Sequence, residues 1–166
     1  SVSNFISEYF QDTYHDKTIQ IVQSAKDGST TADGLLRTAD VAARHPDVVF
    51  IDFSADDGGL DMRSELREMV NLLCAGENIP YIIFLYAADR GYTNLSRYHS
   101  LVAEEFSIPQ IDLSGALRTH LNGSDAILEG YLYDEIHPSA EGHIVYADTI
   151  IRALETGNCY SKPKFN

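Results

Sequence analysis

An aspartate and a histidine stand three residues apart near the carboxyl end of the sequence, within residues 133–143 (YDEIHPSAEGH). At this spacing in a turn or helix, the Asp134 carboxylate and the His137 imidazole share one side. A carboxylate beside an imidazole holds one tautomer and stabilises the imidazolium that forms when the ring takes a proton. Pro138 suits the first turn of a following helix. The pair predicts a general base with its orienting acid; the alternative is a helix-capping loop with a surface histidine.

A metal site is a second chemical reading of the same region, because acidic side chains and His137 could gather around a cation. The spacing gives no support, since neither a His-Glu-x-x-His pair nor a calcium-loop pattern is present. We therefore predict no metal and no cofactor. The residues that such a site would use are Asp56, Asp57, Asp134, Glu135 and His137. The remaining histidines are expected to be surface or structural residues, with His143 packing near the site: His15, His45, His99, His120 and His143.

The length and the net charge of the chain limit its number of domains and the kinds of partner it can bind. The 166 residues, 44% of them hydrophobic, predict a single globular domain. The net charge of −13 argues against nucleic acid or an anionic membrane surface as a partner, because both attract Lys and Arg. No apolar run reaches the length of a membrane span.

Cysteines and glycosylation sequons say little about the compartment. Cys74 and Cys159 permit one disulfide or none, and no Cys-x-x-Cys spacing occurs. Asn-x-Ser sequons at Asn94 and Asn122 favour a secretory route, but the pattern is short. The localisation stays open between a secreted protein and other compartments.

The elements that must position Asp134 and His137 alternate along the chain. Helices are predicted from helical spacing of apolar residues over 4–14, 32–43, 62–75, 95–106 and 139–155, with a helical turn over 116–120. Strands are predicted from β-branched or continuous apolar runs over 18–23, 48–53, 81–86 and 108–113. This alternation predicts a three-layer α/β/α domain with a mainly parallel, flavodoxin-like sheet. In such sheets, sites form in the loops beyond the carboxyl ends of the strands.

Three of those loops together resemble the SGNH (GDSL-type) hydrolases of lipid and carbohydrate esters. Residues 24–31 (SAKDGSTT) resemble the block whose glycine N–H serves an oxyanion hole, with Gly28 as the matching glycine. Residues 46–58 (PDVVFIDFSADDG) resemble the block whose Asn serves the same hole, and Asp134 with His137 fits the Asp-x-x-His block. The likeness spans most of the chain. It implies hydrolysis of carboxylic esters, on acetylated sugars or lipids, by Ser-His-Asp chemistry.

The sequence departs from this family in two places. The Gly-Asp-Ser block that holds the family's nucleophile is absent, and with it the first, central strand of the family's sheet. We therefore expect an N-terminally incomplete domain whose nucleophile comes from outside the chain. It would lie on an N-terminal segment that either is missing from residues 1–166 or has been cleaved to a separate peptide of the same precursor. Asp56 stands where the family has its Asn, and an ionised carboxylate cannot donate to an oxyanion; the alternative for this stretch is a plain acidic turn.

The serines within the chain are poor substitutes for the missing nucleophile. Ser1 and Ser3 abut the first predicted helix, where the family has a strand, a loop and a spacer. Ser29, Ser54 and Ser139 are expected to be a turn residue, a strand-end residue and a helix cap. Two functions therefore remain open: an ester hydrolase that takes a small-molecule or glycan ester, and a catalytically inactive relative that acts as a binding or structural subunit.

Overall fold

A computed structural model describes residues 1–91, 95–123, 128 and 130–165. Three parallel strands form the sheet in the order β1 (Val48–Ile51), β2 (Tyr81–Tyr86), β3 (Gln110–Asp112). β2 is central and buried, as its continuous apolar sequence predicts, because helices cover both of its faces. Because all three strands are parallel, their carboxyl ends lie at one edge of the sheet, which we call the carboxyl-end rim.

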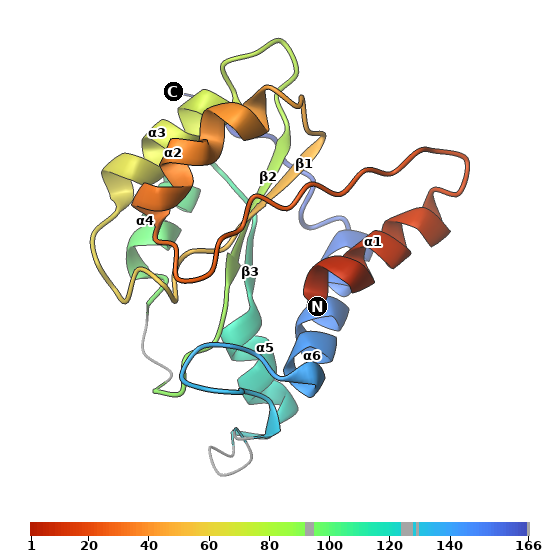
Figure 1. The fold of residues 1–166 in the computed structure, drawn as a ribbon, viewed down its shortest axis with the longest axis vertical. Helices are drawn as coiled ribbons and strands as arrows, with labels where there is room; N and C mark the ends of the chain where they lie inside the picture. The colour runs from red at the N-terminus through yellow and green to blue at the C-terminus, as the bar shows by residue number, and fades with distance from the viewer. Residues whose placement is uncertain (92–94, 124–127, 129, 166) are drawn as a thin grey trace.

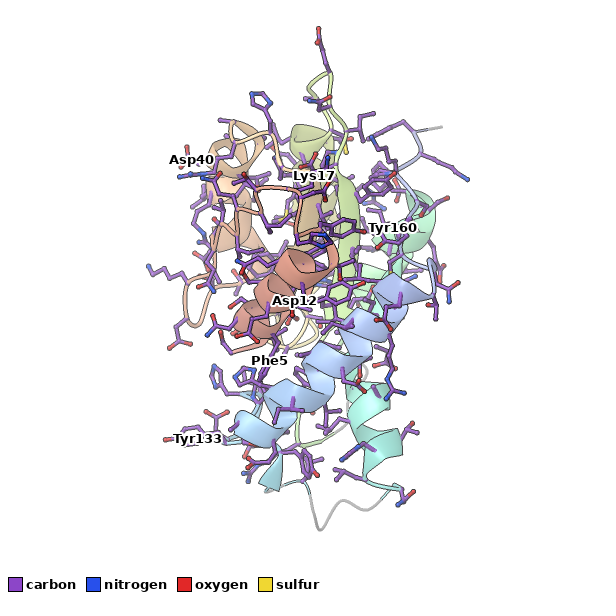
Figure 2. All side chains as sticks on the ribbon, turned by 90° about the vertical axis from the view of Figure 1, so that its right-hand side faces the viewer. Phe5, Asp12, Lys17, Asp40, Tyr133 and Tyr160 are labelled. Carbon is purple, nitrogen blue, oxygen red and sulfur yellow. The ribbon has the colours of Figure 1, made fainter. Side chains whose placement is uncertain are left out.

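Two helix layers cover the sheet (Figure 1). One consists of α2 (Thr31–Ala42), α3 (Arg63–Leu73) and α4 (Arg97–Glu105); the other consists of α1 (Val2–Thr13), α5 (Leu113–His120) and α6 (Ala140–Glu155). Figure 2 looks onto the second layer, in which α1 lies beside α6. Each layer packs its own hydrophobic core against one face of the sheet. The predicted three-layer α/β/α fold is confirmed.

Side chains that begin the helices agree with the sequence. Ser139 caps α6 by accepting a hydrogen bond from the Gly142 N–H at 3.2 Å, as predicted. Asp112 caps α5 in the same way, through the Gly115 N–H at 2.8 Å. At α2, the Asp33 carboxylate accepts from the N–H and the hydroxyl of Thr30. These contacts fix where α2 and α6 start, and both starts lie beside loops of the candidate site.

The prediction of a strand over residues 18–23 is wrong. This stretch is extended but pairs with no strand of the described residues, and its apolar side chains Ile21 and Val22 are 43% and 48% exposed. Two hydrogen bonds hold the end of this stretch and the residue after it. The Gln23 amide contacts the Ser3 hydroxyl at 2.5 Å, and Arg37 Nε donates to the Ser24 carbonyl at 2.9 Å. The segment is therefore bound to α1 and α2, one helix from each layer, and not to β1.

Several smaller predictions can be compared with the fold. Cys74 and Cys159 are both free thiols. Within the described ranges, no helix is long and apolar enough to cross a membrane. Asn94 of the first sequon and Ser124 of the second lie outside the described residues.

Candidate active site

Asp134 and His137 are brought together by a tight turn ahead of α6. The Asp134 carboxylate accepts from the backbone N–H groups of Ile136 and His137, at 3.0 and 2.9 Å. Its other oxygen lies 2.8 Å from His137 Nδ1. The turn is closed by a hydrogen bond from the Tyr133 N–H to the His137 carbonyl at 2.7 Å. One carboxylate thus orders both the backbone and the imidazole of the turn.

The start of α6 holds this turn in place. The Ser139 N–H donates to the Tyr131 carbonyl at 2.9 Å, and the Ser139 hydroxyl donates to the Gly130 carbonyl at 2.7 Å. Gly142 allows the close approach, because a Cβ at this position would collide with the Tyr131 carbonyl oxygen. The imidazole is therefore positioned by a helix start as well as by its carboxylate.

The electrostatics of the pair suit a base and its orienting acid. Backbone N–H groups of His137 and Ile136, together with the His137 ring, lower the pKa of Asp134 to about 2. The Asp134 carboxylate in turn raises the pKa of His137 above its usual value. With Asp134 ionised and bound to Nδ1–H, the neutral ring keeps its lone pair on Nε2.

His137 Nε2 faces the loop that contains Gly28. The Asp27 carboxylate of this loop lies 3.4 Å from Nε2. Gly28 has a positive φ of 64°, in a turn closed by a hydrogen bond from the Ser29 N–H to the Lys26 carbonyl at 3.1 Å. The structure therefore brings the Gly28 loop and His137 to the same rim, as the sequence predicts.

Asp56, from the loop after β1, belongs to the same charge cluster. Burial raises the pKa of Asp56; the charge of His137 opposes this, while Asp57 and Asp27 add to the rise. A carboxyl with a raised pKa holds its proton to higher pH and can then donate a hydrogen bond. Asp52, four residues earlier, is accessible from a groove beside β1; the surrounding protein and the charge of Asp56 raise its pKa, although a hydrogen bond from the Ala87 N–H opposes the rise.

A buried cluster ties the Asp56 loop to the start of α2, and we call it the Asp57 cluster (Thr31, Asp57 and His99). The Asp57 carboxylate accepts from the Thr31 N–H at 2.8 Å and from its hydroxyl at 2.6 Å, and lies 2.7 Å from His99 Nε2. All three residues are at most 1% exposed. Burial raises the pKa of Asp57, but hydrogen bonds from His99 and Thr31 outweigh it, so the net shift is downward.

Sequence reasoning missed the Asp57 cluster. It treated Asp57 as part of an acidic turn or a metal set and His99 as a surface or structural residue. Asp57 lies in the loop beyond β1 and 42 residues before His99, so no local pattern in the sequence could have joined the two. The cluster fixes the Gly28 loop and the Asp56 loop relative to each other.

No serine of the described residues is hydrogen-bonded to His137. Ser29 and Ser54 are buried, Ser139 caps α6, and the hydroxyls of Ser1 and Ser3 bond to each other at 2.9 Å. Across the same described ranges, no group of three or more acidic, His or Cys side chains is arranged to hold a metal ion. Tyr133, next to Asp134, points outward from the molecule and is 81% exposed (Figure 2).

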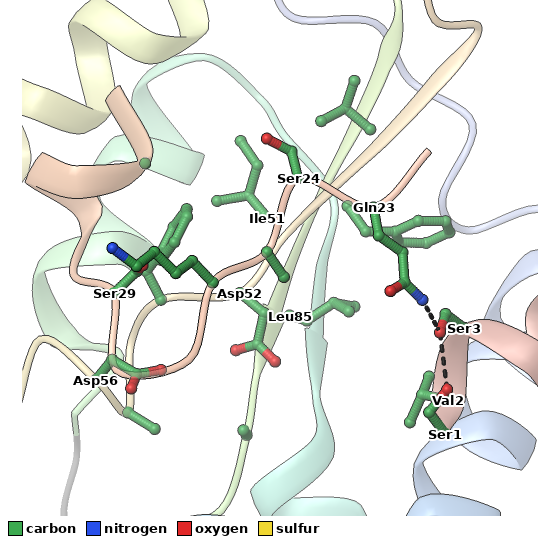
Figure 3. Close-up of a pocket in the computed structure, with 18 of the residues that line it drawn as sticks. Ser1, Val2, Ser3, Gln23, Ser24, Ser29, Ile51, Asp52, Asp56 and Leu85 are labelled. Carbon is green, nitrogen blue, oxygen red and sulfur yellow. Dashed lines mark hydrogen bonds between the residues drawn. The ribbon is translucent and has the colours of Figure 1, made fainter. Parts of the chain in front are cut away.

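A groove of about 630 Å³ opens beside the site (Figure 3). It runs between β1 and the extended segment that contains Gln23 and Ser24, and Asp52 and Asp56 lie at its rim end. His137, His143 and Ser1 also line it. Burial lowers the pKa of His143. His143 thus lies near the site, as predicted.

Comparisons with known proteins find the fold in solved structures. No family model and no curated protein sequence matches the chain. CEX, a two-domain esterase active on acetylated mannans, matches with a TM-score of 0.88 and 18% identity, over 99% of this chain and 46% of CEX, so the chain spans about half of that protein.

Two further structures match over most of their length. Axe2, an acetylxylan esterase from Geobacillus stearothermophilus solved as a catalytic mutant with a serine replaced by alanine, gives a TM-score of 0.73 and 21% identity over 91% of this chain and 79% of Axe2. LAE5, an alpha/beta hydrolase from the metagenome of Lake Arreo, Spain, gives a TM-score of 0.70 and 19% identity. The match covers 96% of this chain and 83% of LAE5. The chain therefore has the three-layer fold on which the acetyl esterases CEX and Axe2 are built.

Proposed function

We propose that this chain is the His-Asp part of an SGNH-type carboxylic-ester hydrolase, whose serine nucleophile comes from outside residues 1–166. The observation that supports the proposal most is the geometry of His137: Nδ1 is bound to Asp134 at 2.8 Å, while Nε2 faces the rim between the Gly28 and Asp56 loops. A base oriented in this way, with its second nitrogen directed toward a cleft, is the arrangement that activates a hydroxyl nucleophile.

In the proposed reaction the serine hydroxyl attacks the ester carbonyl carbon while its proton moves to His137 Nε2. The carbonyl oxygen becomes an oxyanion, which accepts a hydrogen bond from the Gly28 N–H and, in those molecules whose Asp56 is protonated, a second one from the Asp56 carboxyl. The oxyanion collapses, the alcohol leaves with the proton from His137, and an acyl-serine remains. Water then attacks the acyl-serine with His137 again as base, which releases the carboxylic acid and restores the serine.

Acetylated sugars are the substrate class that we propose. Both named esterase neighbours act on acetylated polysaccharides, mannans for CEX and xylan for Axe2. An uncharged sugar ester also suits a chain with a net charge of −13, which would repel an acidic substrate. The exposed ring of Tyr133 beside the dyad offers a surface on which a sugar ring can stack.

A catalytically inactive binding subunit is the second candidate. It is favoured by Asp56 in place of the family Asn and by the lack of a serine hydroxyl on His137 Nε2 among the residues described. An inactive domain gives no reason for a pair as ordered as Asp134 and His137, which is why we place hydrolysis first.

Acetate release from acetylated manno- and xylo-oligosaccharides tests the proposal on the native protein that contains these residues. We expect turnover, and a loss of at least about 10³-fold in His137→Ala, because the general base is gone. His15→Ala is the matched control, since His15 is exposed and distant in sequence from the site, and it should keep full activity. No acetate release from native protein, with folding intact, would favour the binding subunit.

A further inference from the structure

The loop that follows β2 contacts the turn of residues 133–137, which we call the dyad turn, through Arg90. The Arg90 N–H donates to the Glu135 carbonyl at 2.9 Å, and Arg90 Nε donates to the Asp134 carbonyl at 3.0 Å. The Arg90 guanidinium also lies 3.9 Å from the Glu135 carboxylate. Arg90 therefore binds two successive carbonyl groups of the turn whose carboxylate orders His137.

The contact from Arg90 differs in kind from the contacts that close the dyad turn. The hydrogen bond from the Tyr133 N–H to the His137 carbonyl joins near neighbours in the sequence, whereas Arg90 and Asp134 are 44 positions apart. A local hydrogen bond fixes the shape of the turn. A hydrogen bond from the loop after the central strand fixes where the turn lies relative to the sheet, and so relative to the other loops of the rim.

The loop after β2 is itself held in place, which gives Arg90 a fixed base. The Ala87 N–H donates to Asp52 in the loop after β1, and the Ala88 N–H donates to the Tyr146 hydroxyl of α6 at 2.8 Å. Ala88 and Tyr146 are both buried. One short loop thus donates backbone N–H groups to the end of β1, to α6 and to the dyad turn.

We propose that Arg90 is a positioning residue for the dyad. Its guanidinium and its N–H hold residues 134 and 135 against the loop after β2, so that the Asp134 carboxylate stays directed at His137 Nδ1. A guanidinium suits this task because it is planar, always charged and presents its N–H donors in a fixed geometry. The effect on ester hydrolysis rests on the proposed function, whereas the effect on the Asp134–His137 contact does not.

Substrate binding is the alternative role for an arginine at the rim. The observed contacts support it less well, because Arg90 Nε is already bound to the Asp134 carbonyl and Nη1 faces the Glu135 carboxylate. The two roles make different kinetic predictions. Loss of a substrate contact raises KM while kcat stays the same, whereas a misaligned base lowers kcat.

Arg90→Gln tests the proposal, because it removes the guanidinium but keeps the backbone N–H that binds the Glu135 carbonyl. On the native protein that contains these residues, we expect kcat for an acetyl ester to fall by about tenfold, with KM nearly unchanged, since a small displacement of a reacting group is costly. Millimolar guanidinium in the buffer should restore part of the kcat lost in Arg90→Ala. Arg152→Gln is the matched control and should keep full activity, because Arg152 pairs with Asp148 at the exposed surface of α6.

The second readout is the pKa of His137, followed by NMR of the ring C–H group at position ε1. The Asp134 carboxylate raises this pKa, so a loosened Asp134–His137 contact should lower it in Arg90→Gln. The loss of charge alone has the opposite sign, because removing a nearby cation makes the imidazolium easier to form. Asp27 and Asp56, which also face His137, are unchanged in the variant.

A lower pKa of His137 in Arg90→Gln, together with an unchanged one in Arg152→Gln, would support the proposal. An unchanged or higher pKa in Arg90→Gln, or a rise in KM without a fall in kcat, would overturn it. If Arg90→Gln does not fold, Arg90→Lys takes its place: it keeps a cation but loses the planar fork, and the same directions are expected. His137 is titrated without ester turnover, so an inactive protein still decides whether Arg90 positions the dyad.

Discussion

Asp134 positions His137 in two ways. Its carboxylate binds Nδ1 of the ring, and it also accepts hydrogen bonds from the backbone N–H groups of the turn. Asn in its place can still accept from both N–H groups, so the turn should persist while the negative charge is lost. We expect Asp134→Asn to lower kcat/KM for an acetyl ester by about 10³–10⁴-fold, because the imidazolium is no longer stabilised and the tautomer is no longer fixed.

The same variant should shift the pH profile. An imidazole can act as a general base only when its ring is neutral, so activity rises as the pH increases through the pKa of His137. Asp134 raises that pKa above the usual 6.5, and its neutralisation should move the acidic limb to lower pH. A pH–rate profile of both proteins measures the shift. Glu135→Gln is the adjacent control; an acidic limb that stays in place in Asp134→Asn would show that Asp134 does not set the basicity of His137.

Substitution of Asp56 by Asn is expected to increase activity, whereas substitution of Asp134 decreases it. The Asp56 carboxyl can donate a hydrogen bond only while it is protonated, and its raised pKa extends that state to higher pH. Its stabilisation of the oxyanion should therefore be lost as the pH rises further. Asp56→Asn supplies a donor at every pH and is expected to increase kcat at pH 8 by about tenfold or more, within the about 10²–10³-fold value of one oxyanion donor. Steady-state kinetics at pH 6 and pH 8 check this. A variant that is slower than the native protein at both pH values would place Asp56 outside the oxyanion hole.

At the scale of elements, the Asp57 cluster joins the loop after β1 to the first turn of α2 and to α4. Asp57→Ala leaves the Thr31 N–H, the Thr31 hydroxyl and His99 without their acceptor in a buried place, so we expect a loss of about 3 kcal/mol or more in the free energy of unfolding. Urea unfolding followed by circular dichroism measures it. Asp61→Ala is the control, because Asp61 pairs with Arg63 at the surface of the same loop and should change the midpoint little. Equal effects of the two changes would contradict a structural role for the cluster.

Most elements could be predicted from the sequence because their signals are local. Helical spacing of apolar residues placed five helices within a few residues of their observed ends. The continuous apolar run of β2 predicted a strand buried on both faces. The exception is the segment 18–23, whose composition is that of a strand. Strand formation requires a partner at the right distance, which is a non-local condition, and here side chains hold the segment away from β1.

The site divides in the same way. Asp134 and His137 are three residues apart, so their contact follows from local geometry and could be predicted. The Asp57–His99 contact joins residues 42 positions apart, and the groove beside β1 depends on the packing of two helix layers. Neither has a sequence pattern of its own, and both became visible only in three dimensions.

At the scale of the whole molecule, the rim gathers a base, its acid and two loops suited to an oxyanion, while the groove beside β1 leads to the same place. The Gly28 loop and the Asp56 loop are joined through the Asp57 cluster, and the start of α6 holds the dyad. The remaining part of the chemistry, a hydroxyl on His137 Nε2, is proposed to come from a segment outside residues 1–166. Locating the nucleophile is therefore the decisive measurement for the proposed hydrolysis.

Fluorophosphonate labelling of the native protein, followed by peptide mass spectrometry, locates it. The reagent modifies a serine only when a neighbouring base activates it, so the adduct marks the residue that His137 serves. We predict a single adduct on a serine outside residues 1–166, present in His15→Ala and absent in His137→Ala. An adduct on a serine within residues 1–166, or labelling that survives in His137→Ala, would contradict the account.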